Sequence, residues 1–276
     1  MDLWREMGLD GQRALIVHHD DLGVTHAQTQ AYLDLGYPTG SLMAPAAWCT
    51  ALAAHPAADL GVHLTLNSEW TAPRLRPLTP APTLCDAQGF LWRDLASLWQ
   101  HADIGEVEAE LRAQVEAIYR LGVDVTHLDT HMGSIMRPDI AAVYLRLAEE
   151  YRLPAMVPAV LEYHSLPEAF RAPLGEVLAG STHPRVQMLS GYGRPPEEMR
   201  GWYLRVLRKA GPGVYHLIHH AALDTPEARA LPDWQRRTAD LEAFRDAQVR
   251  RAAGEYRLLT YREVREAYRA LLPRGA

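Results

Sequence analysis

The chain has 276 residues, of which 28 are basic and 34 are acidic, so its formal net charge is -6. A chain of this length can form one domain when its fold is an α/β barrel, and we expect a single domain over residues 1–276. The acidic balance offers no cationic surface to a phosphate backbone, which argues against a nucleic-acid partner. Composition leaves a homo-oligomer open.

The two cysteines, Cys49 and Cys85, are too few and too far apart for a disulfide framework or a Cys-x-x-Cys metal site. The first residues contain no basic segment followed by an apolar stretch. No segment reaches the roughly 18 uninterrupted apolar residues that a membrane span needs. We therefore expect a cytoplasmic protein without a membrane partner.

Short apolar runs alternate along the chain with segments of helical periodicity. This alternation is typical of strands that helical crossovers join into a parallel sheet or barrel. The clearest strands are predicted at residues 13–18, 39–44, 60–66 and 125–129, and weaker ones at 154–158, 185–189, 213–219 and 256–260. Helices are predicted at residues 106–121, 137–152 and 234–253. The sequence therefore predicts an α/β fold of seven or eight such units.

Residues 67–104 depart from this alternation, because prolines and tryptophans are concentrated there. The prolines are Pro73, Pro77, Pro80 and Pro82, and the tryptophans are Trp70, Trp92 and Trp99. This composition excludes one regular element. An insertion of this length over a barrel end usually serves a site. The tryptophans can serve in packing or in sugar stacking, and Trp70 is a candidate substrate contact.

Acidic residues and histidines lie at the ends of the predicted strands. Asp20 and Asp21 follow the first strand, His63 lies in the third, and His131 follows the fourth. Because the carboxyl ends of barrel strands converge on one face, these side chains are expected to meet. One carboxylate and two imidazoles leave coordination positions open, as in a catalytic metal site, where the ion would polarise a carbonyl and activate water. Neighbouring side chains of an extended segment point to opposite sides, so one aspartate could serve as general base.

Further histidines belong to the same strand ends. His127 and His131 would lie roughly 13 Å apart in an extended strand, too far to bind one ion together, so His131 is the preferred ligand. Asp129 lies between them and could orient a metal-bound imidazole. His219 or His220 could protonate a leaving amine. The roles of three other histidines stay open, namely His18, His19 and His26.

Each of these residues also has a purely structural interpretation. An Asp-Asp pair after a strand is more often a helix cap or a turn, and a histidine in an apolar strand is more often a core residue. Three strand ends that supply both residue types favour a metal site, because buried polar groups need partners. The chain has no Gly-x-Ser-x-Gly elbow, no His-Glu-x-x-His motif and no dinucleotide fingerprint.

Three motifs together resemble the YdjC-like carbohydrate deacetylases. They are His-His-Asp-Asp-Leu-Gly at 18–23, Gly-Val-His-Leu-Thr-Leu at 61–66 and Thr-His-Leu-Asp-Thr-His at 126–131, and His-Leu-Ile-His-His at 216–220 is similar to the family's late histidine motif. The chain departs from the family's usual pattern at Met132 and Gly133, where further histidines are common, and at His18 and His19, where smaller residues are usual.

The resemblance implies a distorted (β/α) barrel of about seven strands, related to polysaccharide deacetylases. It also implies one divalent ion, magnesium or zinc, held by Asp21, His63 and His131. Asp20 matches the general base and His220 the general acid. The expected reaction removes an N-acetyl group from a small carbohydrate, an amino sugar or a short oligosaccharide. Two alternatives are hydrolysis of another amide or an ester, and a barrel that only binds carbohydrate.

Overall fold

The structure is a computed structural model that describes residues 2–53, 55, 58–161 and 166–273. Strands are present at all the predicted places. They are β1 (Arg13–Leu22), β2 (Thr39–Leu42), β3 (Asp59–Leu64), β4 (Leu128–Thr130), β5 (Val157–Pro158), β6 (Arg185–Ser190), β7 (Gly213–His219) and β8 (Arg257–Leu258). The first strand is longer than predicted and includes Asp20 and Asp21, which were expected to follow it.

Helices follow most of the strands, as a parallel sheet requires. The α-helices are α1 (Leu3–Glu6), α2 (His26–Leu35), α3 (Leu95–His101), α4 (Ile104–Arg120), α5 (Pro138–Glu150), α6 (Glu168–Ala179), α7 (Met199–Lys209), α8 (Trp234–Arg245), α9 (Ala247–Gly254) and α10 (Tyr261–Leu271). The 3-10 turns are η1 (Cys49–Leu52), η2 (Pro82–Leu84), η3 (His131–Met136), η4 (Pro196–Glu198) and η5 (Ala228–Ala230).

The prediction of one helix over residues 234–253 is wrong, because the chain forms two helices there. Asp246 has an extended backbone (φ -65°, ψ 127°), and its carboxylate accepts hydrogen bonds from the amides of Gln248 and Val249. An aspartate in this geometry satisfies free amides at the start of a helix. Asp246 thus ends α8 and begins α9.

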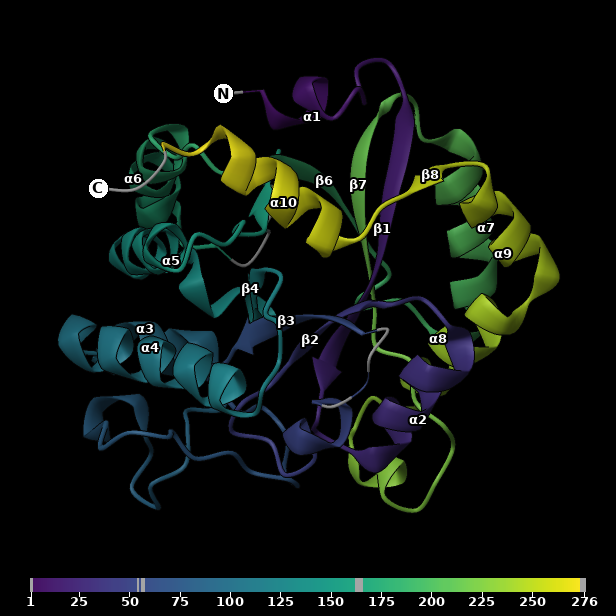
Figure 1. Cartoon of the computed structure of the whole chain (residues 1–276). Helices are drawn as coiled ribbons and strands as arrows, with labels where there is room; N and C mark the ends of the chain where they lie inside the picture. Colours follow the sequence, from purple (N-terminus) through teal and green to yellow (C-terminus); the bar gives the residue numbers. More distant parts are fainter. Residues whose placement is uncertain (1, 54, 56–57, 162–165, 274–276) are drawn as a thin grey trace.

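Seven parallel strands form a barrel in the order β4-β3-β2-β1-β7-β6-β5 (Figure 1). A parallel bridge between Leu128 of β4 and Ala155, just before β5, joins the two ends of the sheet. The barrel is distorted at β1. This strand pairs with β7 along Arg13–His19, whereas β8 pairs with its first half and β2 with its second half. The predicted barrel of about seven strands is therefore confirmed.

Alternation along β1 separates the barrel interior from the outer helix layer. Ala14 and Ile16 point inward and belong to an apolar cluster with Val214 of β7 and with residues of α1 and α10. Leu15 and Val17 point outward and pack against α7, α8 and α9. Period-two alternation accounts for this division. It also places His18 and Asp20 inside the barrel, above the apolar cluster.

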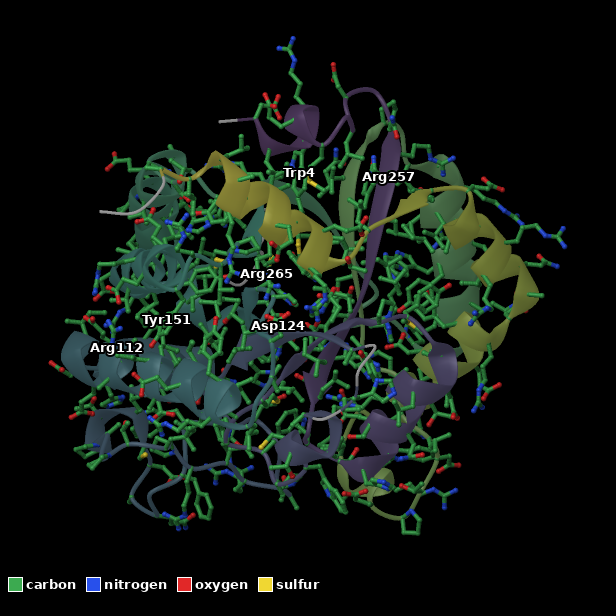
Figure 2. The ribbon with its side chains drawn as sticks, in the orientation of Figure 1. Trp4, Arg112, Asp124, Tyr151, Arg257 and Arg265 are labelled. Carbon is green, nitrogen blue, oxygen red and sulfur yellow. The ribbon has the colours of Figure 1, made fainter. Side chains whose placement is uncertain are left out.

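The amino ends of the strands are closed by α1 and α10. The Trp4 indole of α1 donates a hydrogen bond to the carbonyl of Arg185, at 2.8 Å. Figure 2 shows Arg265 of α10 directed toward Asp124, with which it forms an ion pair. Asp59, the first residue of β3, accepts hydrogen bonds from the amide of Tyr261 at 2.7 Å and from that of Arg262 at 2.9 Å. With this end closed, the opposite end is left for a site.

The proline-rich segment 67–104 is fixed to α4 through two glutamates. Glu110 accepts hydrogen bonds from the amides of Leu78 and Thr79, and Glu106 accepts one from Thr83. Within this segment the structure describes η2 and α3, and the remainder is irregular, as the prolines predict. Among the described residues, no helix combines the length and the apolarity that crossing a membrane would need.

Candidate active site

A cavity of about 270 Å³ opens at the carboxyl ends of the strands. Its lining combines charged and polar residues from separate strand ends with residues of the insertion and of α8. They are Asp20, Asp21, His63, Glu69, Leu95, Thr130, His131, Met132, Gly133, Ser190, Tyr192, Ile218, His220, Asp233 and Arg237. The fold therefore brings residues of the three motifs and of the late histidine motif to one cavity, as convergence of strand ends requires.

Asp21, His63 and His131 converge on one point of this cavity. The Oδ1 atom of Asp21 lies 3.2 Å from Nε2 of His63 and 3.0 Å from Nδ1 of His131. All three residues are buried, and their ligand atoms lie within 4.8 Å of one another. Ligands of a tetrahedral ion at about 2.0–2.1 Å are roughly 3.3 Å apart. This set of one carboxylate and two imidazoles therefore fits a divalent cation.

In both imidazole rings, each of the two nitrogens lies next to a carboxylate. Nδ1 of His63 lies 3.0 Å from Asp129, and Nε2 of His131 lies 2.8 Å from Glu69. Burial lowers the pKa of each ring, but the carboxylates outweigh it: Asp129 and Asp21 raise the pKa of His63 well above its usual value. Glu69 and Asp21 raise the pKa of His131 to about 9. The carboxylates thus favour positive charge at the place where a cation would bind.

Asp129 fixes the orientation of the His63 ring. His63 and Asp129 are register partners on β3 and β4, which brings the two side chains together. Ser41 of β2 donates a hydrogen bond to the other carboxylate oxygen of Asp129, at 2.8 Å. A carboxylate that holds Nδ1–H leaves Nε2 free to bind a metal. The ring that Asp129 orients is therefore that of His63, on the neighbouring strand β3, and not that of a histidine next to Asp129 in sequence.

The backbone of Asp21 explains how two adjacent aspartates reach one cavity. Alternation predicts that their side chains point to opposite sides. Asp21 instead has a left-handed backbone with φ 61°, a conformation that aspartate tolerates better than most residues. This local turn at the end of β1 brings the Asp21 carboxylate to the side that Asp20 already faces. Both residues line the cavity.

Arg237 of α8 neutralises the second oxygen of Asp21. Its Nη2 atom donates to Oδ2 of Asp21 at 2.9 Å, and its Nε atom donates to Asp233 at 2.9 Å. Burial raises the pKa of Asp21, but His131 and Arg237 together lower it well below its usual value. Asp21 therefore remains ionised, with Oδ2 held by Arg237 and Oδ1 directed toward the two rings.

The two late histidines point in different directions. His220 lines the cavity, with Nε2 3.9 Å from Oδ2 of Asp21, and its amide donates to Asp240 at 2.9 Å. Burial lowers the pKa of His220. His219 lies on the outer side of β7, where its ring is 4.7 Å from that of Phe244. Only His220 of this pair is therefore in reach of a substrate in the cavity.

The other predicted candidates are buried near the site or lie away from it. Trp70 is buried beneath His131, with ring centroids 5.0 Å apart. His127 lies inside the barrel, where its Nε2 atom is 2.8 Å from Nε2 of His18. His19 faces outward beside His219. His26 is exposed at the start of α2, next to Trp48.

Sequence reasoning did not select Glu69, Arg237 or Ser41, each of which contacts a member of the site. Glu69 lies directly before Trp70 in the insertion, and insertions over barrel ends commonly carry site residues. This position was the available signal for Glu69. Arg237 lies on a helix predicted from its periodicity, and nothing local distinguishes it from a surface arginine. Its ion pair with Asp21 spans 216 residues of sequence.

Comparison with known proteins gives consistent matches over most of the chain. The family model of the YdjC-like proteins matches residues 14–269. A carbohydrate deacetylase of Thermus thermophilus is 51% identical over 267 residues, which cover 97% of this chain and 99% of that protein. A carbohydrate deacetylase of Geobacillus stearothermophilus is 28% identical, with 91% and 98% covered.

A solved structure has a similar fold. It is a protein of Enterococcus faecalis V583 described as a cellobiose-phosphate cleavage protein, with a TM-score of 0.76 and 20% sequence identity. The match covers 92% of this chain and 99% of that chain. At this identity the likeness concerns the fold. With the family model and the Thermus thermophilus relative, the conclusion is that the chain belongs to the YdjC-like family.

Proposed function

We propose that this protein is a carbohydrate deacetylase that hydrolyses the N-acetyl amide of an amino sugar or a short oligosaccharide. The observation that carries this proposal is the convergence of Asp21, His63 and His131 on one point beside Asp20 and His220, within one cavity. The full-length likeness to a carbohydrate deacetylase, at 51% identity, supports the choice of substrate class.

The proposed cofactor is one divalent ion held by Asp21, His63 and His131. Such an ion supplies Lewis acidity toward the acetyl carbonyl and lowers the pKa of a water molecule. Two imidazoles and one carboxylate are typical ligands of zinc, whereas magnesium prefers oxygen ligands. We therefore favour zinc or another transition metal over magnesium. Metal content and acetate release across a panel of divalent ions would decide between them.

Two residues have proposed roles in proton transfer. Asp20, as general base, takes the proton of the attacking water, since it lines the cavity beside the three proposed ligands. His220, as general acid, passes a proton to the departing amine from the cavity wall formed after β7. Because burial lowers its pKa, His220 has to receive that proton during the reaction cycle. The products are acetate and a free amino sugar.

The size of the cavity supports a small substrate group. A volume of about 270 Å³ is just below the common range of ligand pockets, about 300–1,000 Å³. Tyr192 lines the cavity and is 59% exposed, so its ring is available to a sugar at the entrance. We propose that one sugar residue enters the cavity and that any further residues of the chain remain at the entrance.

The Asp20→Asn variant tests the proposal. It should retain the metal and the fold but lose acetate release from N,N'-diacetylchitobiose by about 10²–10⁴-fold, the usual contribution of a general base. Asp10→Asn is a matched control, since Asp10 is exposed at the opposite end of the barrel. Unchanged turnover in Asp20→Asn would refute the assigned base. Wild-type protein that releases acetate from simple esters but not from N-acetyl sugars would refute the substrate class.

A further inference from the structure

Beneath Asp20, the barrel interior contains a layer of buried rings that the proposed reaction does not use. It comprises His18 of β1, His127 before β4, His216 of β7 and Tyr261 of α10, all 1% exposed or less. The ring of His18 lies 4.5 Å from that of His216, and the ring of Tyr261 stacks on His127 at 3.8 Å. A layer of polar rings at this depth is costly unless each polar atom has a partner.

Hydrogen bonds connect this layer to Asp20. Nδ1 of His18 lies 2.6 Å from Oδ1 of Asp20, and Nε2 of His18 lies 2.8 Å from Nε2 of His127. Nδ1 of His127 lies 3.0 Å from the hydroxyl of Thr126. These contacts form one chain from Thr126 through two imidazoles to the carboxylate.

Proton positions along this chain follow from the donor and acceptor inventory of each group. An ionised Asp20 only accepts, so Nδ1 of His18 carries a proton and donates it. In the matching tautomers, Nε2 of His18 accepts from Nε2–H of His127, whose Nδ1 accepts from the Thr126 hydroxyl. Burial lowers the pKa of His127 well below its usual value, which limits this ring to one proton. Every nitrogen in the chain then has a partner.

A second metal ion in this layer fits the distances less well. Ligand atoms of His18, Asp20 and His216 lie within 4.8 Å of one another. However, tetrahedral ligands at about 2.0–2.1 Å would be roughly 3.3 Å apart. The His18–Asp20 and His18–His127 contacts, at 2.6 and 2.8 Å, are instead hydrogen-bond lengths.

We propose that His18 is a positioning residue for Asp20, and that His127 and Thr126 hold His18 in its Nδ1–H tautomer. This inference rests on the proposed function, in which Asp20 is the general base. The bond to Oδ1 fixes the plane of the carboxylate and leaves Oδ2 to take the proton of water. His18 does not line the cavity and acts only through Asp20.

Nitrogen-15 NMR of the histidine rings tests the tautomers without any turnover. In metal-free protein at pH 7, His18 should show a protonated Nδ1 and a bare Nε2, and His127 the reverse. The single variants His18→Asn and His127→Gln assign the two signals by their loss. A His18 ring protonated only at Nε2 would overturn the inference, whether or not the protein is a deacetylase.

Kinetics then compare two variants of equal polarity. His18→Asn places an amide N–H where Nδ1 was, whereas His18→Gln places it near Nε2 and away from Asp20. We expect His18→Asn to keep kcat within about threefold of wild type. His18→Gln should lose about 10–100-fold in kcat with little change in KM, since a hydrogen bond to a charged group is removed. His216→Leu is the matched control, because His216 lies in the same layer but bonds to Tyr261.

The outcomes separate this inference from the proposed function. Wild-type protein without acetate release refutes the proposed function, and the tautomers alone then decide the inference. An active wild type with equal kcat in His18→Asn and His18→Gln overturns the inference and leaves the function standing. Both variants should bind one equivalent of Zn²⁺ in calorimetry, because His18 makes no contact with the three proposed ligands in the described structure.

Discussion

Two groups of histidines are similarly buried but differ in their neighbours. His63 and His131 lie at the rim of the barrel, in the cavity, and His127 and His216 lie in the interior layer beneath it. At the rim, each nitrogen of His63 and His131 faces a carboxylate, and the pKa of both rings is raised. In the interior, the rings of His127 and His216 face other rings and hydroxyl groups, and burial lowers their pKa well below the usual value.

For these four rings, neighbouring carboxylates and not depth decide whether the pKa is raised or lowered. Burial disfavours the charged ring in both places. Around His63 and His131, three carboxylates outweigh this cost and favour positive charge, which a divalent cation would replace in the proposed site. In the interior, the lowered pKa values of His127 and His216 favour neutral rings, which serve as hydrogen-bond donors and acceptors. Three experiments can break or sharpen this comparison.

The largest expected effect is a loss of stability of the metal-free protein at alkaline pH. The folded-state pKa of His131, about 9, is above its ordinary value of 6.5, so its contribution is complete below pH 6.5 and is lost as pH rises through 9. By linkage the contribution amounts to roughly 3 kcal/mol. Urea unfolding in EDTA at pH 6.5, 8 and 9.5 measures it.

The control for this pH series is His131→Asn, which should show a shallower decline over the same range. Wild type and variant that decline equally would contradict the raised pKa. His127 and His216 act with the opposite sign: because their folded pKa is lowered, their contribution is lost on the acid side, as pH falls below 6.5. Zn²⁺ should remove the alkaline decline in wild type, since the metal replaces the protons.

The next effect is on metal affinity, in Asp129→Asn. This change removes a carboxylate from Nδ1 of His63 and gives that ring a neutral partner like those of the interior. We expect Zn²⁺ affinity to fall about 10–100-fold, as for other carboxylates that orient a metal-bound histidine. Calorimetric titration at pH 7.5 measures this change. Affinity equal to wild type would show that His63 does not need Asp129 to bind the metal.

The smallest expected effect is on the interior layer alone, in Gly61→Ala. A Cβ atom at Gly61 of β3 would lie 2.5 Å from the His127 ring, and displacing the ring should cost about 1–3 kcal/mol of unfolding free energy. Gly201→Ala on α7 is the control, because its Cβ meets nothing within 4 Å, and alanine favours a helix by about 0.5–1 kcal/mol. Zn²⁺ affinity should be unchanged in both variants. A loss of Zn²⁺ affinity in Gly61→Ala would show that the interior layer and the proposed metal site are energetically coupled.

Strand positions and the three proposed ligands could be predicted from the sequence, because both depend on local order. Apolar runs mark the strands, and polar residues at their ends meet wherever parallel strands converge. The division of α8 from α9 was not predicted, since the extended backbone at Asp246 interrupts a continuous helical pattern. The length of β1 was also missed, because Asp20 and Asp21 are polar and lie at an irregularity between the paired residues His19 and Leu22.

Contacts between distant residues were beyond the reach of sequence patterns. Arg237 pairs with Asp21 and Glu69 with His131, and neither pair shares a local motif. The layer of rings under Asp20 was equally hidden. His18 and His127 are 109 residues apart, and only the closure of the barrel places one above the other. Their side of each strand could be predicted, but their partners could not.

The cap that Asp59 forms on α10 affects the order in which the chain can fold. Tyr261 closes the ring layer, and it reaches that position only after α10 docks onto the start of β3. During synthesis, the strands that carry the proposed ligands emerge from the ribosome long before this helix does. Until residue 261 is available, His216 lacks the hydroxyl that it bonds in the finished barrel. A nascent chain therefore acquires its proposed metal ligands early and its sealed interior last.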